Sequence, residues 1–556
     1  DNLDILRRYV ADESVDLVYL DPPFKSDQDY NVLFAEKSGA QAAAQIRAFG
    51  DTWTWDSVAA LTYEETMRNG GRVAEGMYAL RALLGPSDML AYLAMMAPRL
   101  VELHRALKPT GSIYLHCDPT ASHYLKLLLD SVFRPDSFRN EIIWQRANAK
   151  GLMTRALPTN HDVILSYHKT PEATWNEDGL FTPYDLADLD EKTDEKYSLE
   201  DADGRRYQLT SLINPNQNRP NLTYEFLGVT RVWRWTKERM DEAYRAGFVV
   251  QPRPGGVPRF KRYLDQQRGK PLGDVWTDIP PINARAAERL GYPTQKPQQL
   301  LERIIRLSSV EGDVVLDPFC GCGTTVSAAQ ALKRRWIGID ITHLAIGLIR
   351  SRLNHAFGPD IKGTYKVIGE PVEVEDAAAL AEQDRYQFQF WALGLVNARP
   401  ATRDEKRGAD KGIDGRLFFH DEAERAGKTK QIILSVKSGS VQARDVRDLC
   451  AVVDREGAQI GALLTLQDPT RDMRKEAAGA GFYELPGRGR FPKIQIFTIA
   501  ELLAGKEIEY PHWRSNVTFR RAPKAEAQPA AEAQGALPLL GGDGGVEPDR
   551  QRRPAK

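Results

Sequence analysis

Four residues near the start of the chain, Asp21-Pro22-Pro23-Phe24, combine a carboxylate, a rigid turn and an aromatic ring. They directly follow Val15–Leu20, a short apolar run that predicts a buried parallel strand. In open α/β sheets, ligands bind beyond the carboxyl ends of the strands, which is where this tetrapeptide stands. A plain tight turn is the alternative, because each proline fixes φ and stops strand pairing. The four residues alone do not decide between the two.

A second stretch that could bind a ligand is DPFCGCGTT, residues 317–325. An apolar run at 313–316 predicts a strand before it, and 324–332 has helical spacing after it. Gly321 and Gly323 would let the backbone approach a ligand, and the next predicted strand, 336–339, ends at Asp340, where Rossmann-like units bind ribose. The loop lacks a P-loop lysine, which favours adenosine without phosphates. Turn glycines and a helix N-cap at Asp340 are the structural alternatives.

In this order, these stretches resemble the motifs of β-class amino-group DNA methyltransferases, which include the modification subunits of type III restriction systems. The matching segments are Asp21–Phe24 for the catalytic motif, GYPTQKP (291–297) for the motif that leads a cofactor-contacting helix, DPFCGCGTT for the glycine loop, and GSIYLHCDPTASHYLK (111–126), NEIIWQR (140–146) and HDVILSYHK (161–169). The resemblance implies a Rossmann-like α/β fold, S-adenosylmethionine as methyl donor and double-stranded DNA as substrate.

The chemistry of an exocyclic amine explains the first motif. Its lone pair is delocalised into the base, so hydrogen bonds to the Asp21 carboxylate and the Pro22 carbonyl would favour the pyramidal nitrogen of the transition state. Pro23 would keep the turn rigid, and Phe24 would stack on a base flipped out of the duplex. The N6 amine of adenine is the predicted target, because the family's N4-cytosine enzymes more often carry Ser in place of Asp21. N4-cytosine methylation is the alternative.

The resemblance also implies a cofactor site with two sides. Asp340 is expected at the ribose, and the residues TQKP are expected opposite the glycine loop. A solvated surface lysine is the alternative for Lys296, and His116-Cys117-Asp118, which ends a third predicted strand, is interpreted as architectural. The predicted cofactor residues are Asp317, Pro318, Phe319, Gly321, Gly323, Thr324, Asp340, Thr294, Gln295, Lys296 and Pro297.

The strand and helix pattern loosens over residues 169–285 and the composition becomes basic. Between 205 and 270, 14 Lys and Arg residues stand against 5 Asp and Glu residues, whereas the whole chain has a formal charge of −1. Interleaved aromatic, Asn and Gln residues suit phosphate contact and base readout. Arg259, Lys261 and Arg262 are therefore predicted to bind DNA. A solvated charged face is the alternative.

A second unit follows residue 359. Its order of strand, strand, helix and strand around Asp414 and Lys437 resembles the Mrr-like branch of the PD-(D/E)XK nuclease fold. Ser435 stands where that family has its second carboxylate, so Asp414 would be the remaining ligand of a Mg²⁺ ion. We expect DNA binding without efficient cleavage, unless Asp410 or Glu382 completes the site. A turn cap at Asp414 and an edge-strand lysine at Lys437 are the alternatives.

Length and composition give the organisation. A chain of 556 residues exceeds what one core normally covers, so several domains are expected. The predicted parts are a catalytic half (1–168), an inserted target-recognition region (169–285), a cofactor-binding half (286–358), a nuclease-like α/β domain (375–515) and a disordered tail (520–556).

Two classes of protein are disfavoured. Four cysteines, at 117, 320, 322 and 450, form neither a disulfide framework nor a zinc site. No apolar run approaches the ~20 residues that span a bilayer, so a cytoplasmic protein without membrane contact is expected. A homodimer or a separate restriction subunit is the protein partner that the resemblance allows. A combined restriction and modification enzyme with an active C-terminal nuclease is the functional alternative.

Overall fold

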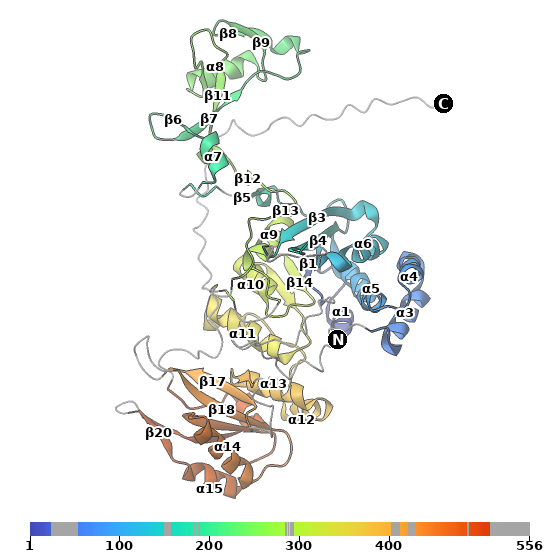
Figure 1. The fold of residues 1–556 in the computed structure, drawn as a ribbon, viewed down its shortest axis with the longest axis vertical. Helices are drawn as coiled ribbons and strands as arrows, with labels where there is room; N and C mark the ends of the chain where they lie inside the picture. The colour runs from blue at the N-terminus through green and yellow to red at the C-terminus, as the bar shows by residue number, and fades with distance from the viewer. Residues whose placement is uncertain are drawn as a thin grey trace.

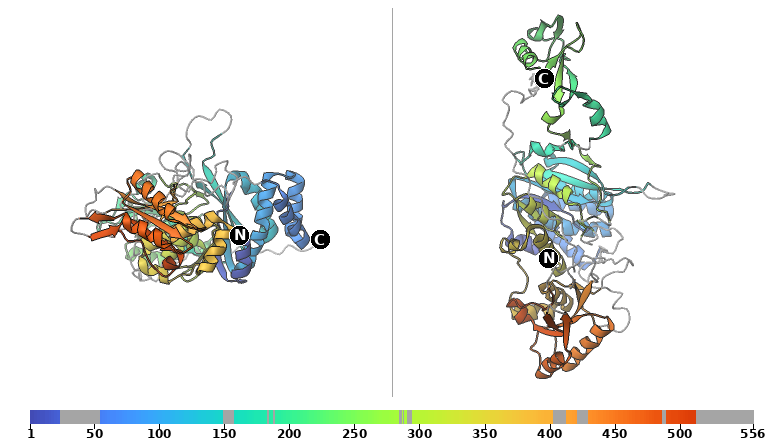
Figure 2. Two further views of the ribbon diagram at one scale, coloured as in Figure 1. Left: turned by 90° about the horizontal axis from the view of Figure 1, so that it is seen from below. Right: turned by 90° about the vertical axis from the view of Figure 1, so that its left-hand side faces the viewer.

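The computed structural model describes residues 1–23, 54–148, 157–182, 184–186, 189–283, 286, 288–289, 294–401, 412–420, 429–485 and 489–511. It contains a seven-stranded sheet in the order β13-β3-β4-β2-β1-β14-β15 and a separate five-stranded sheet in the order β16-β17-β18-β19-β22. The predicted α/β fold with a separate C-terminal α/β unit is thereby confirmed. The basic inserted region and the C-terminal unit lie at opposite ends of the part built on the large sheet (Figures 1 and 2).

The centre of the large sheet is parallel. β1 pairs in parallel with β2 and β14, and β14 pairs in parallel with β15. β4 runs antiparallel to both β2 and β3, and β13 is parallel to β3. The carboxyl ends of β1, β2, β14 and β15 therefore share one edge with the amino end of β4. The strands are β1 (Val15–Leu20), β2 (Leu107–Cys117), β3 (Phe138–Gln145), β4 (His161–His168), β13 (Val275–Trp276), β14 (Val314–Asp317) and β15 (Arg335–Gly338).

Helices cover both faces of this sheet. Successive side chains of a strand point to opposite faces, so Val18 of β1 packs in a core with α5 and α6, while Leu17 packs in a core with α9 and α10. Such two-sided burial explains the unbroken apolar run of β1. The helices are α1 (Asn2–Tyr9), α3 (Ser57–Asn69), α4 (Gly71–Leu84), α5 (Asp88–Ala106), α6 (Pro119–Phe133), α9 (Gln298–Ser308), α10 (Thr324–Ala331) and α11 (His343–Phe357).

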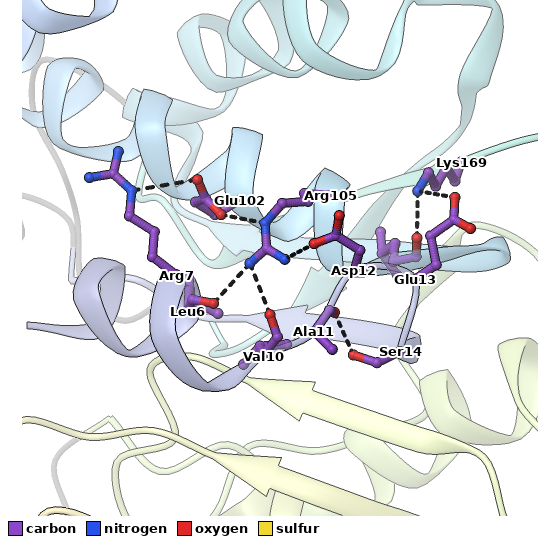
Figure 3. A network of polar contacts seen from close by, with 11 residues as sticks. Leu6, Arg7, Val10, Ala11, Asp12, Glu13, Ser14, Glu102, Arg105 and Lys169 are labelled. Carbon is purple, nitrogen blue, oxygen red and sulfur yellow. Dashed lines mark hydrogen bonds and ion pairs between the residues drawn. The ribbon is translucent and has the colours of Figure 1, made fainter.

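A polar network fixes α1 and the entry to β1 (Figure 3). The Arg105 guanidinium of α5 donates to the Leu6 and Val10 carbonyls at 2.9 and 3.0 Å, which satisfies acceptors left open at the end of α1. It also pairs with Glu102 at 2.6 Å and with Asp12. These contacts hold the segment that leads into β1, and so help to set where β1 ends.

The inserted region has a small core of its own, made of Leu212, Phe226, Trp233, Met240 and Val249. It contains a four-stranded sheet in the order β10-β11-β7-β6 and a hairpin of β8 and β9. Its elements are β5 (Phe181–Thr182), α7 (Glu191–Lys196), β6 (Leu199–Glu200), β7 (Arg206–Ser211), β8 (Thr223–Phe226), β9 (Val229–Val232), α8 (Lys237–Arg245), β10 (Val249–Val250), β11 (Arg259–Tyr263) and β12 (Lys270–Pro271). The chain then returns through β13 to the large sheet, inside the range predicted as insertion.

The C-terminal unit packs helices on both faces of its five-stranded sheet. β17 is antiparallel to β18, whereas β18, β19 and β22 are parallel. Its elements are α12 (Val374–Gln383), α13 (Arg385–Leu395), β16 (Arg399–Pro400), β17 (Gly415–Phe419), β18 (Lys430–Lys437), α14 (Ala443–Arg455), β19 (Ile460–Thr465), α15 (Arg471–Gly479), β20 (Phe482–Leu485), β21 (Gly489–Pro492), β22 (Ile494–Thr498) and α16 (Ile499–Leu503). In the described parts of the chain, no helix is long and apolar enough to cross a membrane.

Candidate active site

Asp21 directly follows β1 at the shared carboxyl edge of the sheet. Its side chain is 17% exposed and lines a cavity together with Pro23, while Pro22 of the same turn is buried. The two prolines end the strand because neither has an N–H for the ladder. Phe24, the last residue of the predicted motif, lies outside the described residues.

The Asp21 carboxylate forms an ion pair that its sequence motif does not reveal. Nζ of Lys296 lies 2.5 Å from Oδ2 of Asp21, although the two residues are 275 positions apart. The Lys296 side chain is 13% exposed, which excludes the alternative of a solvated surface lysine. The TQKP segment and the first motif are therefore joined by the contact between these two side chains.

The cavity brings together most of the predicted cofactor residues. Asp21 at the end of β1 faces the glycine loop after β14 and the residue Asp340 after β15. Pro22, Pro297 and Gly323 are not part of its lining. The lining residues are Asp1, Asn2, Tyr19, Asp21, Pro23, Met95, Arg99, Thr294, Gln295, Lys296, Leu301, Asp317, Pro318, Phe319, Cys320, Gly321, Cys322, Thr324, Thr325, Asp340, Ile341 and Thr342.

The carboxylates of Asp317 and Asp340 accept hydrogen bonds from the backbone of the glycine loop. The Phe319 N–H donates to Oδ1 of Asp317 at 3.0 Å, and the Gly321 N–H donates to Oδ2 of Asp340 at 3.0 Å. Oδ1 of Asp340 accepts from both the backbone N–H and the hydroxyl of Thr342 at 2.9 Å. Asp340 thus holds the loop by hydrogen bonds and also lines the cavity. A structural role and a ligand-binding role for this residue are therefore compatible.

Burial controls the charge of these carboxylates. It raises the pKa of Asp317 to about 7, an effect that hydrogen bonds from Thr325 and Phe319 oppose and the charges of Asp21 and Asp340 reinforce. Burial also raises the pKa of Asp340, against the hydrogen bonds from Thr342 and Gly321. A cationic ligand in this cavity would favour the ionised form of both carboxylates.

Gly323 serves helix packing and does not face the cavity. It has φ +73°, the left-handed region, at the N-cap of α10. A Cβ added there would lie 2.6 Å from Cγ1 of Ile349 on α11. The expectation that Gly323 leaves room for a ligand is therefore corrected, because the close approach is between its own backbone and α11.

Arg352 of α11 supports the glycine loop by hydrogen bonds. Its side chain is buried and donates to Oγ1 of Thr324 at 3.0 Å and to Oε1 of Gln298 at 3.3 Å. Burial lowers the pKa of Arg352. The side chain links the glycine loop with the first residue of α9, immediately after TQKP.

A buried chain of polar groups lies behind Asp21. The Tyr19 hydroxyl is 2.9 Å from Nδ1 of His116, and Nε2 of His116 is 3.0 Å from Oδ2 of Asp162. Burial raises the pKa of Asp162, but the hydrogen bond from His116 and the charges of His116, Lys296 and Arg146 more than offset it, and the net pKa is lowered. These contacts support an architectural role for His116, which is fully buried.

Asn2 and Arg99 are cavity residues that the sequence did not indicate. The Asn2 amide donates to the Pro318 carbonyl at 2.9 Å and accepts from Nε of Arg99 at 2.8 Å. Burial lowers the pKa of Arg99 to about 10. One pattern could have pointed to Arg99: it is a cation on the apolar, buried side of α5.

The predicted DNA-contacting residues do not share one surface. On β11, Arg259 and Lys261 stand opposite Ser211 and Leu209 of β7 on one face, whereas Arg262 points to the other face, as strand alternation requires. Arg262 there donates to Gln267 at 2.6 Å. DNA contact by the three residues stays a prediction, and the structure separates Arg262 from the other two by face.

Several aromatic residues of the inserted region also differ from expectation. Trp233 and Phe226 are buried in the core of the region, and Phe260 packs edge-on against Trp235. They hold the small sheet together and are not exposed for base stacking. On β11, the aromatic Tyr263 lies on the same face as Arg259 and Lys261, and Phe260 lies on the same face as Arg262.

The C-terminal unit brings Asp414 and Ser435 together but uses the carboxylate internally. Oδ2 of Asp414 accepts from the Val436 N–H at 2.7 Å and from the Ser435 hydroxyl at 3.3 Å, and Oδ1 accepts from Gln389 at 3.0 Å. Among the described residues, no group of three or more His, Cys, Asp or Glu side chains could hold a metal ion.

Of the two residues that could complete this site, the structure describes only Glu382. Glu382 is exposed on α12, and Asp410 lies outside the described residues. Gln389 of α13, which carries no charge, occupies the place beside Asp414. Lys437 ends β18 one residue beyond Val436.

Two family models match the chain. The N6_N4_Mtase model, described as DNA methylase, matches residues 15–350. The model of the NACHT-associated inactive restriction endonuclease 1 matches residues 396–504. The predicted resemblances of the two parts, to amino-group DNA methyltransferases and to a restriction-endonuclease-like fold, are thereby confirmed.

Curated relatives are similar over the first part of the chain. Type II methyltransferase M.EcaI of Enterobacter cloacae is 29% identical over 302 residues, which cover 54% of this chain and 65% of that protein. The Mod subunit of the type III restriction-modification enzyme StyLTI of Salmonella typhimurium is 25% identical over 347 residues, or 60% of this chain and 49% of that protein. Type II methyltransferase M.BamHI of Bacillus amyloliquefaciens is 41% identical over 350 residues, or 63% and 55%. The chain thus spans less than two thirds of each of these relatives.

The family model covers more than half of the chain, and its range includes both the turn after β1 and the glycine loop after β14. The chain therefore belongs to the N6_N4_Mtase family of DNA methylases.

Proposed function

We propose that the chain transfers a methyl group from S-adenosylmethionine to the exocyclic N6 amine of a flipped adenine in double-stranded DNA. One observation carries the proposal: the Asp21 carboxylate lines the same cavity as Asp317, Phe319 and Asp340. A hydrogen-bond acceptor for an amine and the predicted cofactor residues therefore open onto a common space. Transfer between two bound molecules requires such a shared space.

The charged groups and the apolar surface of the cavity walls both suit this cofactor. S-adenosylmethionine supplies an electrophilic methyl group on a positively charged sulfonium. The carboxylates of Asp21, Asp317 and Asp340 give the walls the complementary charge. Phe319 and Ile341 add apolar surface, and Ile341 is 48% exposed beside Asp340, where an adenine ring would cover it.

The residues of the first motif would act on the amine and not on the cofactor. Asp21 and the Pro22 carbonyl accept its hydrogens, which favours the pyramidal nitrogen that develops in the transition state. Phe24 is proposed as the stacking surface for the flipped base. The glycine loop and TQKP orient the donor, with Arg352 and Asn2 as their supports.

The proposal of adenine over cytosine as the target base rests on one residue. Both bases present an exocyclic amine to the same acceptors, and an aspartate at position 21 is the feature that the resemblance associates with adenine. The test is to incubate the protein with unmethylated plasmid and S-adenosylmethionine labelled in its methyl group, and then to identify the labelled nucleoside after digestion. N6-methyladenine is the expected product, and N4-methylcytosine would select the alternative.

Arg259 and Lys261 are the proposed phosphate contacts of the inserted region. They point to the same face of β11, and their neighbours on β7 there are the small or apolar residues Ser211 and Leu209. Two cations on one side of a small sheet suit a DNA backbone. A cytoplasmic location and a homodimer or separate restriction subunit stay predictions.

For the C-terminal unit we propose DNA binding without cleavage. The contacts of Asp414 with Val436, Ser435 and Gln389 support this proposal, because they occupy the carboxylate that magnesium would need. A combined restriction and modification enzyme has no comparable support from this site. Its Mg²⁺ ion would have Asp414 as the remaining predicted ligand.

A further inference from the structure

Lys296 holds one specific oxygen of Asp21. Its Nζ lies 2.5 Å from Oδ2, and among the described residues no other cation forms an ion pair with this carboxylate. No described residue donates a hydrogen bond to Oδ1. The contact therefore fixes Oδ2 and leaves Oδ1 without a donor among the described residues, on a side chain that lines the cavity.

Acidic and ionisable groups surround this pair from several elements. Tyr19 lies on β1, Cys117 ends β2, Asp317 ends β14 and Asp162 is the second residue of β4. After burial, the charge of Asp21 is among the causes that raise the pKa of Tyr19, Cys117 and Asp317. The positive charge of Lys296 acts on Asp162 as well as on Asp21. Lys296 is thus the counter-ion at the centre of an acidic cluster.

A carboxylate in such surroundings depends on its counter-ion. Burial and neighbouring negative charges favour the protonated form, and an adjacent cation favours the ionised form. A protonated carboxyl group donates a hydrogen bond through one of its oxygens and loses acceptor capacity there. An acceptor for a hydrogen of an amine therefore has to keep a free lone pair and its orientation.

We propose that Lys296 is a positioning residue for methyl transfer, which holds Oδ2 of Asp21 and directs Oδ1 to the target amine. This inference rests on the proposed function and assigns Lys296 to the amine side of the site. The sequence motif instead predicts a cofactor contact for Lys296. The two roles differ in the step that a substitution should affect.

The experiment compares Lys296→Met and Lys296→Arg with the wild type. Single-turnover methyl transfer to plasmid is measured at saturating S-adenosylmethionine from acidic to alkaline pH, and the Kd of the cofactor is measured by calorimetry without DNA. Lys366→Met is the matched control, because Lys366 is exposed and does not line the cavity. The same substitutions are then made in an Asp21→Asn background, where the ion pair no longer exists.

Lys296→Met should lower the rate by about tenfold or more across the measured pH range, because Oδ2 of Asp21 would no longer be held. The cofactor Kd should change less than about threefold, and Lys296→Arg should keep most of the rate, because it keeps the charge. The thermal midpoint should fall in Lys296→Met but not when Asp21→Asn is already present.

Three results would overturn the inference. A Kd raised more than about tenfold with an unchanged rate at saturation would make Lys296 a cofactor ligand. A faster rate in Lys296→Met would make the ion pair an obstacle that the amine displaces. A drop in the thermal midpoint that persists in Asp21→Asn would show that Lys296 does not act through Asp21. Absence of methyl transfer by the wild type is distinguishable from all three, since it would refute the proposed function itself.

Discussion

The backbone N–H of Val436 donates a 2.7 Å hydrogen bond to Oδ2 of Asp414, which ties the start of β17 to the end of β18. Ser435 donates to the same oxygen, and Gln389 donates to the other. In a magnesium-dependent nuclease, the carboxylate at this place has to offer its lone pairs to the metal. Here Asp414 satisfies donors of the chain itself, which is a structural use of the carboxylate.

The first prediction concerns cleavage by this unit. Unmethylated supercoiled plasmid incubated with the full chain and Mg²⁺ should stay supercoiled on a gel, because Asp414 is engaged and Ser435 adds no negative charge. Lys437→Ala should give the same pattern as the wild type. Nicking by the wild type that disappears in Lys437→Ala would contradict this account and support the restriction alternative.

The second prediction concerns the pH dependence of cofactor binding. Burial raises the pKa of Asp317 to about 7, so this carboxyl is mostly neutral below that pH and mostly ionised above it. The ionised form attracts a sulfonium, so the Kd of S-adenosylmethionine should fall as the pH rises through about 7 and level off above it. Calorimetric titrations across this range measure the change.

Two controls isolate the charge of Asp317. S-adenosylhomocysteine lacks the sulfonium charge, so its Kd should change less with pH than that of S-adenosylmethionine. Asp317→Asn should flatten the pH dependence for both ligands. An equally steep dependence in Asp317→Asn would assign the titration to another group.

The third prediction concerns two effects that would destabilise a variant at Gly323, the backbone conformation and the contact with α11. Gly323→Ala should destabilise the protein by about 1 kcal/mol or more, because its φ is +73° and its Cβ would meet Ile349 at 2.6 Å. Gly312→Ala is the matched control, since Gly312 has φ +88° but open space around its Cβ direction. Thermal unfolding should show the larger loss for Gly323→Ala. Equal losses would mean that contact with α11 adds nothing.

The fourth prediction concerns the two faces of β11. The double variant Arg259→Ala/Lys261→Ala should weaken DNA binding and reduce the slope of log K against log salt by nearly two, at about 0.9 per phosphate contact. Arg262→Ala is the control, because its side chain points to the opposite face and donates to Gln267. Fluorescence anisotropy at several salt concentrations measures the slopes. A larger effect of Arg262→Ala would place the DNA on the other face.

The ends of parallel strands were predictable from the sequence. The run Val15–Leu20 coincides with β1, and the glycine loop stands between β14 and α10 as its turn residues indicate. Parallel strands buried on both faces read as unbroken apolar runs, and polar residues or prolines end them. For this reason Asp21, Asp317 and Asp340 could be assigned to one edge before the structure was known.

Contacts between distant side chains could not be predicted in this way. The ion pair of Lys296 with Asp21 joins residues 275 positions apart, and no local pattern encodes such a distance. The same holds for Arg99, whose buried charge is satisfied by Asn2 and by Asp1 at 2.6 Å. The arrangement of the basic residues was not predictable for a different reason: a count of charges does not record that Lys261 and Arg262 point to opposite faces of a strand.

The proposed mechanism makes Asp21 an acceptor for a hydrogen of the adenine amine. Its most direct test is mass spectrometry of nucleosides from plasmid treated with S-adenosylmethionine and either the wild type or Asp21→Asn. We expect N6-methyladenine with the wild type and a loss of about 10²-fold or more in Asp21→Asn, with the calorimetric Kd of the cofactor nearly unchanged. N6-methyladenine formed at a similar rate by Asp21→Asn, or no methylated nucleoside with the cofactor-binding wild type, would contradict it.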